Sequence, residues 1–505
     1  MRPGTTYTPP SPSMRDRPMQ RPETATPPQR AADPTAERYR AQRIQHWDRI
    51  AADGERRPTG RYYHRRLAEI FRHLVAPGLR VLELGCGQGD LLAALHPSRG
   101  VGVDFSPEML RRARARHPEL TFLEQDAHAL EVEGPFDAVI LSDLVNDLWD
   151  VQGVLERVRA VCTPSTRIYV NTYSRLWELP LAIAKRLGLA RPELRQNWLT
   201  PEDVENLFTL AGFEPLRRFH DVLCPVSVPL LARFANAFLA KLWPFRHLAL
   251  TNVLVARPSP RPADAAEPLV SVIVPARNEA GNIRNILERT PEMGVGTELV
   301  FVEGHSTDDT WAAIEREIAA HPERRCQALR QPGKGKGDAV RHGFAAAKGD
   351  VLMILDADLT VPPEDLPRFY EALRDGKGEF VNGVRLIYPM EDRAMRFLNL
   401  LGNKFFSLAF SWLLGQSIKD TLCGTKVLWR RDYERIAANR SYFGEFDPFG
   451  DFDLIFGAAR QNLALVDLPI RYRERTYGTT NIQRFRHGLI LLRMVLFAAR
   501  RIKFI

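Results

Sequence analysis

Residues 351–358 read VLMILDAD, an apolar run that ends in two carboxylates, Asp356 and Asp358. The run predicts a buried strand over 351–355. If the strand geometry continues, the first and third residues of Asp356-Ala357-Asp358 point the same way. Two carboxylates on one side repel each other and are costly to desolvate, unless a hard cation neutralises them. The pair therefore predicts a divalent-cation site, and a solvated acidic turn is the simpler alternative for such a pair taken alone.

Around this run, strand and helix patterns alternate in two separate stretches of the chain. After a helical segment at 36–75, the strands are expected at 80–84, 100–103, 121–123, 136–141, 167–172 and 248–256, and then at 269–274, 298–302 and 351–355. Strands that alternate with helices are typical of parallel sheets covered on both faces. We therefore expect an α/β protein with two doubly wound domains.

The composition of the segments before and between the two alternating stretches predicts the domain limits. Residues 1–35 are rich in Pro, Arg and Thr and predict a disordered tail. Residues 258–268 are rich in Pro and Ala and predict a linker. The domains are then expected at 36–257 and 269–485, followed by an amphipathic helix at 486–505.

Length and charge exclude some classes of protein. At 505 residues the chain is longer than one hydrophobic core normally serves. The net charge of +9 favours an anionic partner, but no basic helix interleaves with aromatic residues, so nucleic acid is not expected. The five cysteines form no CxxC pair, which predicts neither a disulfide framework nor a zinc site and fits a reducing cytoplasm.

A glycine-rich loop follows the first expected strand. Residues 85–89 read GCGQG, which lets backbone N–H groups approach a ligand closely. The dinucleotide fingerprint would need a glycine where Asp90 stands, so the pattern argues against NAD. Asp104 ends the second strand, where a carboxylate can accept ribose hydroxyls, and Asp126 follows the third strand.

The runs VLELGCGQG, VGVDFS, LEQDAHAL and FDAVILSDLV resemble the class I S-adenosylmethionine-dependent methyltransferases, over residues 75–257. The resemblance implies a Rossmann-like domain that binds S-adenosylmethionine. By this resemblance Asp104 binds the ribose, and Asp126 with Ala127 binds the adenine edge. The methionine part would be cradled by Glu83, Gly85, Gly87 and Gly89. The methyl acceptor stays open, since Asp143, Asn146 and Asp147 either orient it or form an ordinary polar loop.

The second stretch carries a polar loop at the end of each expected strand. The four loops lie within 275–279, 303–310, 333–338 and 356–358. A sugar nucleotide requires this combination of groups: polar side chains for the base and ribose, a cation for the diphosphate, and basic groups for developing charge.

The runs VSVIVPARNEAGNI, FVEGHSTDDT, KGKGDAVRHGF, ILDADLTVPP, VNGVR, DTLCGTKV, FDLI and RTYGTTN resemble the inverting GT-A glycosyltransferases of family 2. Within that family they are most similar to the polyprenyl-phosphate (dolichyl-phosphate) mannosyltransferases, over residues 268–485. The resemblance implies Mg²⁺ or Mn²⁺ at Asp356 and Asp358. The residues that would contact the nucleotide sugar are Pro275, Arg277, Asn278, Glu279, Glu303, Lys336, Asp356, Arg385 and Lys426, with Arg475 meeting the phosphates.

The sequence departs from that branch at three places. Residues 303–306 read EGHS where the branch has Asp-Asp-Gly-Ser, which leaves the choice of base open. Thr360 replaces a glutamine, so one metal contact is altered. Residues 478–481 read GTTN where the branch has Gly-x-Ser-Lys, which removes a cation near the acceptor phosphate.

The acceptor decides the mechanism. A polyprenyl phosphate is already ionised and needs no base, whereas a hydroxyl must lose a proton, for which Asp453, with Asp451 close by, is the best candidate. Two enzymatic alternatives therefore stay open: transfer to a polyprenyl phosphate, or to a hydroxyl in polysaccharide or secondary-metabolite synthesis. In a third reading the first domain is only a binding module.

Three apolar segments, at 225–250, 397–415 and 488–505, are interrupted by Lys and Arg. No run of about 18 uncharged apolar residues occurs, so no transmembrane helix is expected. Such segments can lie in the headgroup plane of an anionic membrane, or they can pack on the protein core. The expected location is cytoplasmic and peripheral, on the inner face of the membrane.

Overall fold

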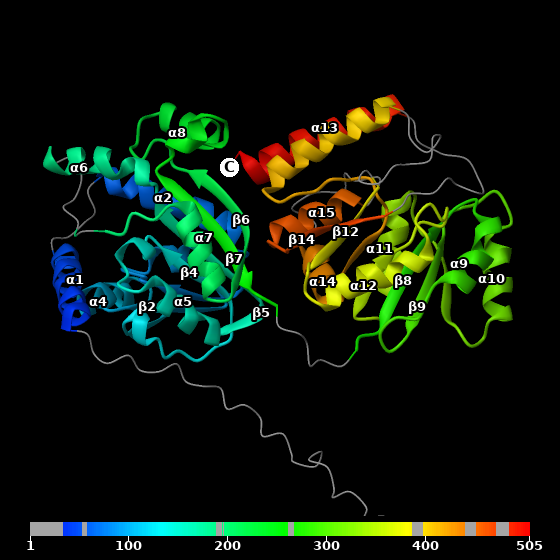
Figure 1. Cartoon of the computed structure of the whole chain (residues 1–505), viewed down its shortest axis with the longest axis horizontal. Coiled ribbons are helices and arrows are strands. Elements are labelled where there is room, and N and C mark those ends of the chain that lie inside the picture. The colour runs from blue at the N-terminus through cyan, green and yellow to red at the C-terminus, as the bar shows by residue number, and fades with distance from the viewer. Residues whose placement is uncertain are drawn as a thin grey trace, which may run out of the picture.

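The computed structural model describes residues 34–52, 58–187, 194, 196–260, 267–385, 397–439, 451–470 and 484–504. The chain forms two α/β halves that lie side by side, each built on a seven-stranded sheet (Figure 1). The expected fold class, two doubly wound α/β units, is confirmed. The expected tail at 1–35 falls almost wholly outside the described residues.

The sheet of the first half has the strand order β3-β2-β1-β4-β5-β7-β6. Its strands are β1 (Arg80–Leu84), β2 (Arg99–Asp104), β3 (Thr121–Glu124), β4 (Phe136–Ser142), β5 (Cys162–Tyr173), β6 (Phe213–Asp221) and β7 (Thr251–Pro258). β1 to β5 run parallel, whereas β7 is antiparallel to both β5 and β6. The sheet is thus mixed rather than wholly parallel.

Helices cover both faces of this sheet (Figure 1). They are α1 (Pro34–Ala52), α2 (Pro58–Leu74), α3 (Asp90–Ala94), α4 (Pro107–Arg116), α5 (Val151–Ala160), α6 (Glu178–Arg186), α7 (Pro201–Leu210) and α8 (Leu231–Ala237), with short 3₁₀ turns η3 (Arg175–Trp177), η4 (Leu239–Lys241) and η5 (Phe245–Leu248). The single helical segment expected at 36–75 is two helices. Pro58 begins α2, a position where a missing N–H costs nothing.

The sheet of the second half has the order β10-β9-β8-β11-β13-β12-β14. Its strands are β8 (Val270–Ala276), β9 (Thr297–Glu303), β10 (Arg325–Arg330), β11 (Val351–Ile354), β12 (Phe380–Val384), β13 (Lys426–Trp429) and β14 (Leu465–Pro469). β13 is antiparallel to its neighbours β11 and β12, so this sheet is mixed as well. In both sheets the strand order reverses beside the first strand, β1 or β8, and ligands of such folds bind at that point beyond the carboxyl ends of the strands.

Helices also cover both faces of the second sheet. They are α9 (Ile283–Arg289), α10 (Thr310–Ala320), α11 (Lys336–Ala346), α12 (Leu366–Arg374), α13 (Phe397–Leu414), α14 (Arg430–Ala438), α15 (Asp451–Arg460) and α16 (Arg484–Ala498), the last continued by a π-helical turn, η9 (Ala499–Lys503). α13 and α16 lie side by side and bury Phe410, Leu413, Leu491 and Met494 in the same core.

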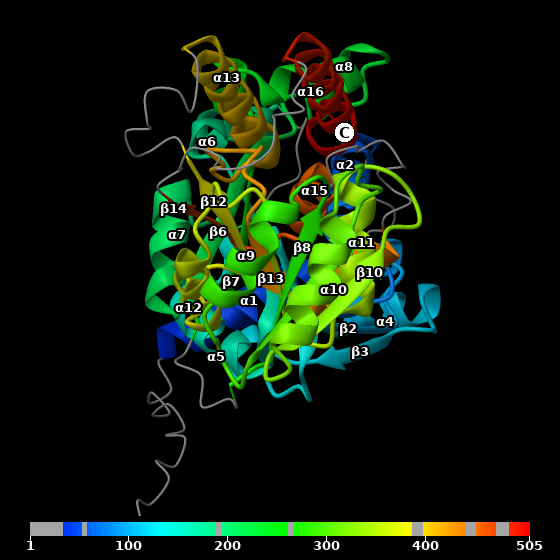
Figure 2. The same ribbon diagram turned by 90° about the vertical axis from the view of Figure 1, so that its right-hand side faces the viewer.

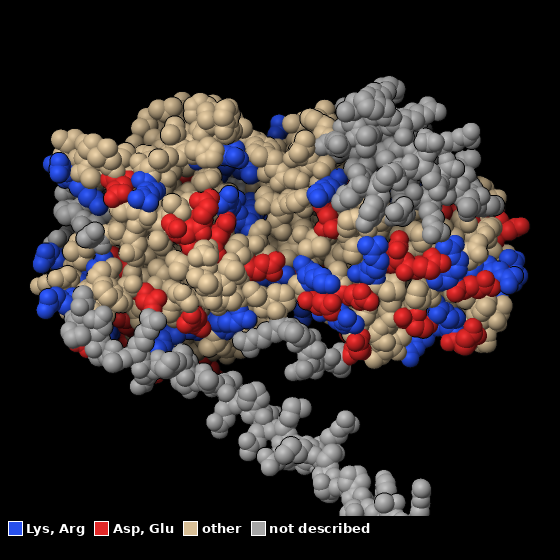
Figure 3. Space-filling view, in the orientation of Figure 1, with Lys and Arg blue, Asp and Glu red and all other residues tan. Residues whose placement is uncertain are grey.

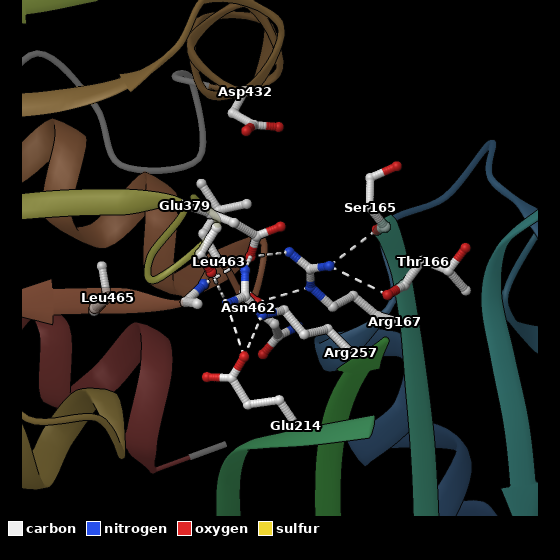
Figure 4. Close-up of polar contacts among 12 residues, drawn as sticks. Ser165, Thr166, Arg167, Glu214, Arg257, Glu379, Asp432, Asn462, Leu463 and Leu465 are labelled. Atoms are coloured by element: carbon white, nitrogen blue, oxygen red, sulfur yellow. Dashed lines mark hydrogen bonds and ion pairs between the residues drawn. The ribbon is translucent and has the colours of Figure 1, made fainter. Parts of the chain in front are cut away.

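Buried ionic and polar contacts join the two halves (Figure 4). Arg167 of β5 donates to the carboxylate of Glu379 at 2.6 Å and to the carbonyl of Asn462 at 2.8 Å. Arg257 of β7 lies 3.4 Å from the same Glu379 carboxylate and 2.7 Å from that of Glu214. Asn462 in turn donates to the carbonyl of Leu74 on α2. These contacts hold the two halves together in a fixed arrangement.

Exposed apolar side chains gather along one edge of the molecule, formed by η3 and α6, by α8 with η4 and η5, and by the outer faces of α13 and α16. Among the described residues, all exposed large apolar side chains except Trp149, Leu210 and Val295 belong to segments 176–187, 226–248, 405–408 and 492–496. We call these four segments the apolar edge. Figures 1 and 2 both place α6, α8 and α13 along the same edge, and Figure 3 shows few charged side chains over α8. Within the described residues, no helix has the length and hydropathy needed to cross a bilayer.

Candidate active sites

The glycine loop after β1 adopts a backbone that requires glycine. Gly85, Gly87 and Gly89 have φ values of 68°, 51° and 76°. A Cβ at Gly85 would lie 2.8 Å from a Leu144 methyl, and one at Gly89 would lie 2.6 Å from the ring of Phe122. The loop thus turns sharply from β1 into α3 and leaves its backbone close to whatever binds there.

Asp104 lies at the carboxyl end of β2, directly beside this loop. Its two oxygens accept the backbone N–H groups of Gly87 and Ser106, each at 2.9 Å. Burial raises the pKa of Asp104, and these backbone bonds offset the rise only in part. Each carboxylate oxygen still has a second lone pair with which to accept a hydroxyl. Glu83, at the end of β1, is 2% exposed and faces the same loop region.

Helix α1 lies over the loops that follow β3 and β4. Arg40 is 2.9 Å from Asp126, and Arg43 and Trp47 both donate to Asp147, at 2.8 and 2.9 Å. Asp126 also accepts from His128, and the neighbouring Ala127 is buried. Burial alone would raise the pKa of Asp126, but His128 and Arg40 lower it overall. The packing of α1 over these loops was not expected from the sequence.

The loop after β4 contains a second cluster of polar side chains, whose role in orienting the methyl acceptor was undecided from the sequence. Asp143 has a φ of 54° and accepts from the Tyr63 hydroxyl at 2.8 Å and from the Asn171 amide at 2.5 Å. Tyr63 is buried, and burial together with Asp143 raises its pKa well above 10. Tyr63 was missed because α2 is distant in sequence from β4 and carries no motif.

In the second half, Asp356 forms the centre of a compact ionic cluster. β11 ends at Ile354, so Asp356 and Asp358 lie in the turn that follows and not in the strand itself. Both carboxylates nevertheless lie near Lys336, whose pKa each of them raises. Lys336, at the start of α11, lies 2.5 Å from Asp356.

In this cluster, burial and the attraction between opposite charges shift each pKa in opposite directions. Burial alone would raise the pKa of Asp356, but Lys336, Lys426 and Arg385 lower it overall. Conversely, burial would lower the pKa of Lys336, but Asp356, Asp451 and Asp358 raise it. The structure thus brings Lys336, Asp356, Asp358, Arg385, Lys426 and Asp451 close together.

Two further ion pairs hold the basic members of the cluster. Lys426 is fully buried and lies 2.9 Å from Asp451 at the start of α15. Arg385 is held by both oxygens of Asp420, at 2.7 and 2.8 Å. Asp420 was not singled out from the sequence, although it begins the run DTLCGTKV that carried the resemblance.

The loops after β8 and β9 are tied together by hydrogen bonds. Asn278 has a φ of 56° and accepts from the backbone N–H of Thr307 at 2.8 Å. Glu303 accepts from the N–H of Ser306. Glu279 is buried in the first loop and accepts from the amide of Asn282 at 2.8 Å. Arg277 is exposed. With Pro275 at the end of β8, these residues all lie at the carboxyl edge of the sheet.

Of the predicted bases and the third predicted phosphate ligand, the structure describes only the two bases, Asp451 and Asp453. Asp451 is occupied by Lys426, whereas Asp453 lies 3.7 Å from Arg341, a residue the sequence analysis did not consider. Arg475 and the segment 478–481 lie outside the described residues.

The donor set at Asp356 and Asp358 suits a hard cation. In the described part of the chain, no three or more His, Cys, Asp or Glu side chains are grouped to hold a metal ion. The protein would therefore supply two carboxylates, and diphosphate and water oxygens would complete the coordination. Carboxylate and phosphate oxygens are the ligands that Mg²⁺ and Mn²⁺ prefer.

Comparison with known proteins assigns a family to each half. The description "Methyltransferase domain" matches residues 76–212, and "Glycosyl transferase family 2" matches residues 271–437. An undecaprenyl-phosphate 4-deoxy-4-formamido-L-arabinose transferase of Edwardsiella ictaluri is 29% identical over 44% of this chain and 64% of its own length. A dolichol-phosphate mannosyltransferase of Pyrococcus furiosus is 36% identical over 21% of this chain and 30% of its own length.

The match thus spans less than two thirds of the length of either relative. Among solved structures, magnesium protoporphyrin IX methyltransferase from Synechocystis with bound SAH is 20% identical, with a TM-score of 0.32, over 45% of this chain and 98% of that one. The chain therefore joins a methyltransferase domain to a glycosyltransferase domain of family 2.

Proposed function

We propose that the second half transfers a sugar from a nucleotide-sugar to a polyprenyl phosphate, and that the first half is an S-adenosylmethionine-dependent methyltransferase. The observation that carries the sugar-transfer proposal is the cluster around Asp356. Three cations (Lys336, Lys426 and Arg385) surround one carboxylate at the switch point of the sheet. This arrangement suits a ligand with several negative charges, such as a donor diphosphate.

The cations of the cluster would stabilise the departing diphosphate. The Nζ atom of Lys336 lies 2.5 Å from a carboxylate oxygen of Asp356. The flexible side chain of Lys336 would let its ammonium group turn toward a phosphate. Asp356 and Asp358 would hold a divalent cation, whose chemistry is to neutralise charge on the diphosphate oxygens. Arg385 and Lys426, fixed by Asp420 and Asp451, would keep their positions during transfer.

The reaction needs no base when the acceptor is a phosphate. An oxygen of the ionised acceptor phosphate attacks the anomeric carbon, the bond from that carbon to the donor diphosphate breaks, and the nucleoside diphosphate leaves with the electron pair. The similarity to an undecaprenyl-phosphate transferase and a dolichol-phosphate transferase supports the proposal of a polyprenyl phosphate acceptor. The engagement of Asp451 with Lys426 also fits a reaction in which that carboxylate is not a base.

The apolar edge supports a membrane-bound acceptor. Leu179, Leu230, Trp243 and Leu408 are 70, 87, 73 and 74% exposed, although each is a large apolar side chain. Contiguous exposure of this kind is typical of protein or membrane contact sites. We propose that the protein is peripheral on the inner face of the membrane, where a polyprenyl phosphate presents its headgroup.

For the first half, the loop at 85–89 and Asp104 would hold the methionine and ribose of S-adenosylmethionine. Methyl transfer depends mainly on positioning the donor sulfonium and the acceptor. The Tyr63–Asp143 pair at the end of β4 is the polar group best placed to orient an acceptor.

The experiment is a screen of GDP-, UDP- and dTDP-sugars against polyprenyl phosphate with Mn²⁺. It compares the wild type with Asp358→Ala and with Asp350→Ala, a matched control at the opposite end of β11. We expect transfer by the wild type and the control, and its loss in Asp358→Ala with an unchanged thermal unfolding curve. Retained transfer in Asp358→Ala would exclude the cation site, and transfer to hydroxyl acceptors alone would favour the polysaccharide alternative.

A further inference from the structure

A hollow lined by basic side chains lies between the two halves, away from both candidate active sites. It encloses about 410 Å³, part of it open to solvent, where α2, β6, η4 and η9 meet. We call it the interdomain pocket. Its lining is Arg66, Ile70, His73, Leu74, Arg217, Phe219, Asp221, Lys241, Ile502 and Lys503.

The pocket holds more positive than negative charge. Four cations line it against one carboxylate, Asp221. That carboxylate is shared, since it forms ion pairs with both Arg66 and Lys241. Among the described residues, no carboxylate lies within ion-pair distance of Arg217 or Lys503. Lys503 donates to the carbonyl of Trp412 at 2.9 Å, so what both side chains lack is a carboxylate that would balance their positive charge.

Arg217 is the most constrained of these cations. It is 8% exposed, and its Nε atom has no hydrogen-bond partner in the described structure. Its guanidinium lies 5.1 Å from the ring of Phe219, and its side chain packs at the end of α13 against Gly415. The enclosed Nε–H is itself out of reach of a ligand, but the side chain of Arg217 lines the pocket and has no carboxylate partner within the described part of the chain. A buried charge without a counter-charge is unfavourable, so an anion bound in the pocket would stabilise it.

The protonation behaviour of the lining agrees with this surplus. Burial, with the charges of Arg217, Lys241 and Arg246, lowers the pKa of Lys503 to about 7. Burial and Arg460 lower the pKa of Arg217 to about 10. Burial, with the charges of Arg460, Arg217, Lys241 and Arg66, lowers the pKa of His73 to about 2. Each group is therefore harder to charge than it would be in water, as expected where cations face one another.

The pocket is distinct from the two active sites. β6 is the edge strand of the first sheet and lies four strands away from β1. At the usual strand spacing this places the pocket about 19 Å from the glycine loop. On the other side, α15 begins at Asp451 in the ionic cluster and ends at Arg460, which donates to the carbonyl of His73. Its ten residues correspond to about 15 Å.

We propose that the interdomain pocket binds a phosphate group through Arg217, Lys241 and Lys503. A phosphate monoester carries about two negative charges and several acceptor oxygens, which match a guanidinium and two ammonium groups. The pocket adjoins the apolar edge, because Phe504, next to Lys503, stacks on Phe238 at 5.3 Å. The phosphate can accordingly come from a lipid headgroup or from a soluble phosphorylated compound. This inference does not depend on either proposed transfer reaction.

The test uses the full chain with two probes, inorganic phosphate measured by calorimetry and phosphatidylcholine vesicles with or without phosphatidic acid. The variants are Arg217→Gln and Lys503→Met. The control is Arg218→Gln, because Arg218 is next in the same strand but exposed and paired with Glu202. Binding of S-adenosylmethionine and the unfolding temperature report whether each variant is folded.

We expect inorganic phosphate to bind the wild type and the control, and both pocket variants to lose about tenfold or more in affinity. If the source is a lipid headgroup, the pocket variants also lose the extra binding caused by phosphatidic acid. If the source is soluble, their vesicle binding equals that of the wild type. The proposal is overturned if phosphate binds neither protein, or if folded Arg217→Gln and Lys503→Met bind both probes as the wild type does.

Discussion

Gly424 lies so close to Asp356 and Lys336 that a Cβ at this position would overlap the ends of both side chains. The absence of a side chain here is what allows the loop before β13 to close over the ionic cluster. The Gly424→Ala substitution should therefore displace the carboxylate and lower sugar transfer by about 100-fold, the usual effect of a misplacement of about 1 Å. Steady-state assays should show this loss, while Lys419→Ala, an exposed change nearby, keeps full activity. Activity of Gly424→Ala within twofold of the wild type would contradict the assignment.

Asp432, on α14 near the contact between the halves, offers a test by pH. It is 2% exposed, and burial, followed by the charge of Glu379, raises its pKa from 3.8 to about 6. The unfolded chain ionises this group more readily, so it destabilises the fold above about pH 6 and ceases to do so as the pH falls toward 4.

The Asp432→Asn variant should consequently be more stable than the wild type at pH 8, by about 1–3 kcal/mol, with a gain that shrinks toward pH 4. Thermal unfolding across this pH range measures the difference, and the exposed Asp375→Asn serves as control. A gain that is the same at pH 4 and pH 8 would show that the charge of Asp432 is not its cause.

Sequence reasoning located single residues better than it located their partners. Asp104 and Glu303 end strands and Asp356 follows one, and strand ends can be read from apolar runs. The pairs Arg385–Asp420 and Lys426–Asp451 could not be predicted, because their members lie in elements and loops far apart along the chain. Such pairing depends on strand order, which no local pattern encodes.

At the scale of elements, α1 is the feature that most affects the first site. Asp48 of α1 accepts from the Ser106 hydroxyl at 2.5 Å and lies at the N-terminus of α4. The Asp48→Ala change should loosen α1 and weaken S-adenosylmethionine binding by about five- to tenfold. Calorimetric titration measures this affinity, and Arg49→Ala, an exposed change on the same helix, should leave it unaltered. Unchanged affinity in Asp48→Ala would mean that α1 does not support the site.

The elements themselves were largely predictable, but their directions were not. The apolar runs located β1, β4, β8 and β11 to within a few residues. The reversal of β7 was missed, since an antiparallel strand of a mixed sheet carries the same apolar pattern as a parallel one. β13, which is also antiparallel, was not expected as a strand at all. The sequence analysis also overlooked α6 as part of the apolar edge, because its Leu and Ile residues read as an ordinary amphipathic helix.

At the scale of the whole molecule, the apolar edge is built from both halves. Replacing Leu179 and Trp243 together by Glu removes two of its most exposed apolar groups. We expect binding to anionic phospholipid vesicles to fall by about tenfold or more, since each buried group contributes about 1.5–3 kcal/mol. Co-sedimentation measures binding, and Val295→Glu, an equally polar change at an exposed site elsewhere, is the matched control. Equal losses in control and variant would exclude a specific membrane face.

Glu379 is the carboxylate on which the two halves converge. Burial alone would raise its pKa, but Arg167 and Arg257 lower it overall. The Glu379→Gln variant leaves the buried Arg167 guanidinium without its carboxylate partner, and Arg257 with Glu214 alone. It should lower the free energy of unfolding by about 3 kcal/mol. Chemical denaturation measures this loss. Glu288→Gln, which breaks an exposed pair with Arg284, should cost less than about 1 kcal/mol. A similar small loss in Glu379→Gln would show that the contact is not structurally important.

The convergence of Arg167 and Arg257 on the Glu379 carboxylate has a practical consequence for dissecting the enzyme. A fragment ending before residue 267 would leave Arg167 without its carboxylate partner and Arg257 with Glu214 alone. The complementary fragment would carry Glu379 without either arginine. Truncated versions should therefore express poorly alone and recover when produced together. Assigning either catalytic activity will accordingly require inactivating point changes in the intact tandem, not isolated pieces.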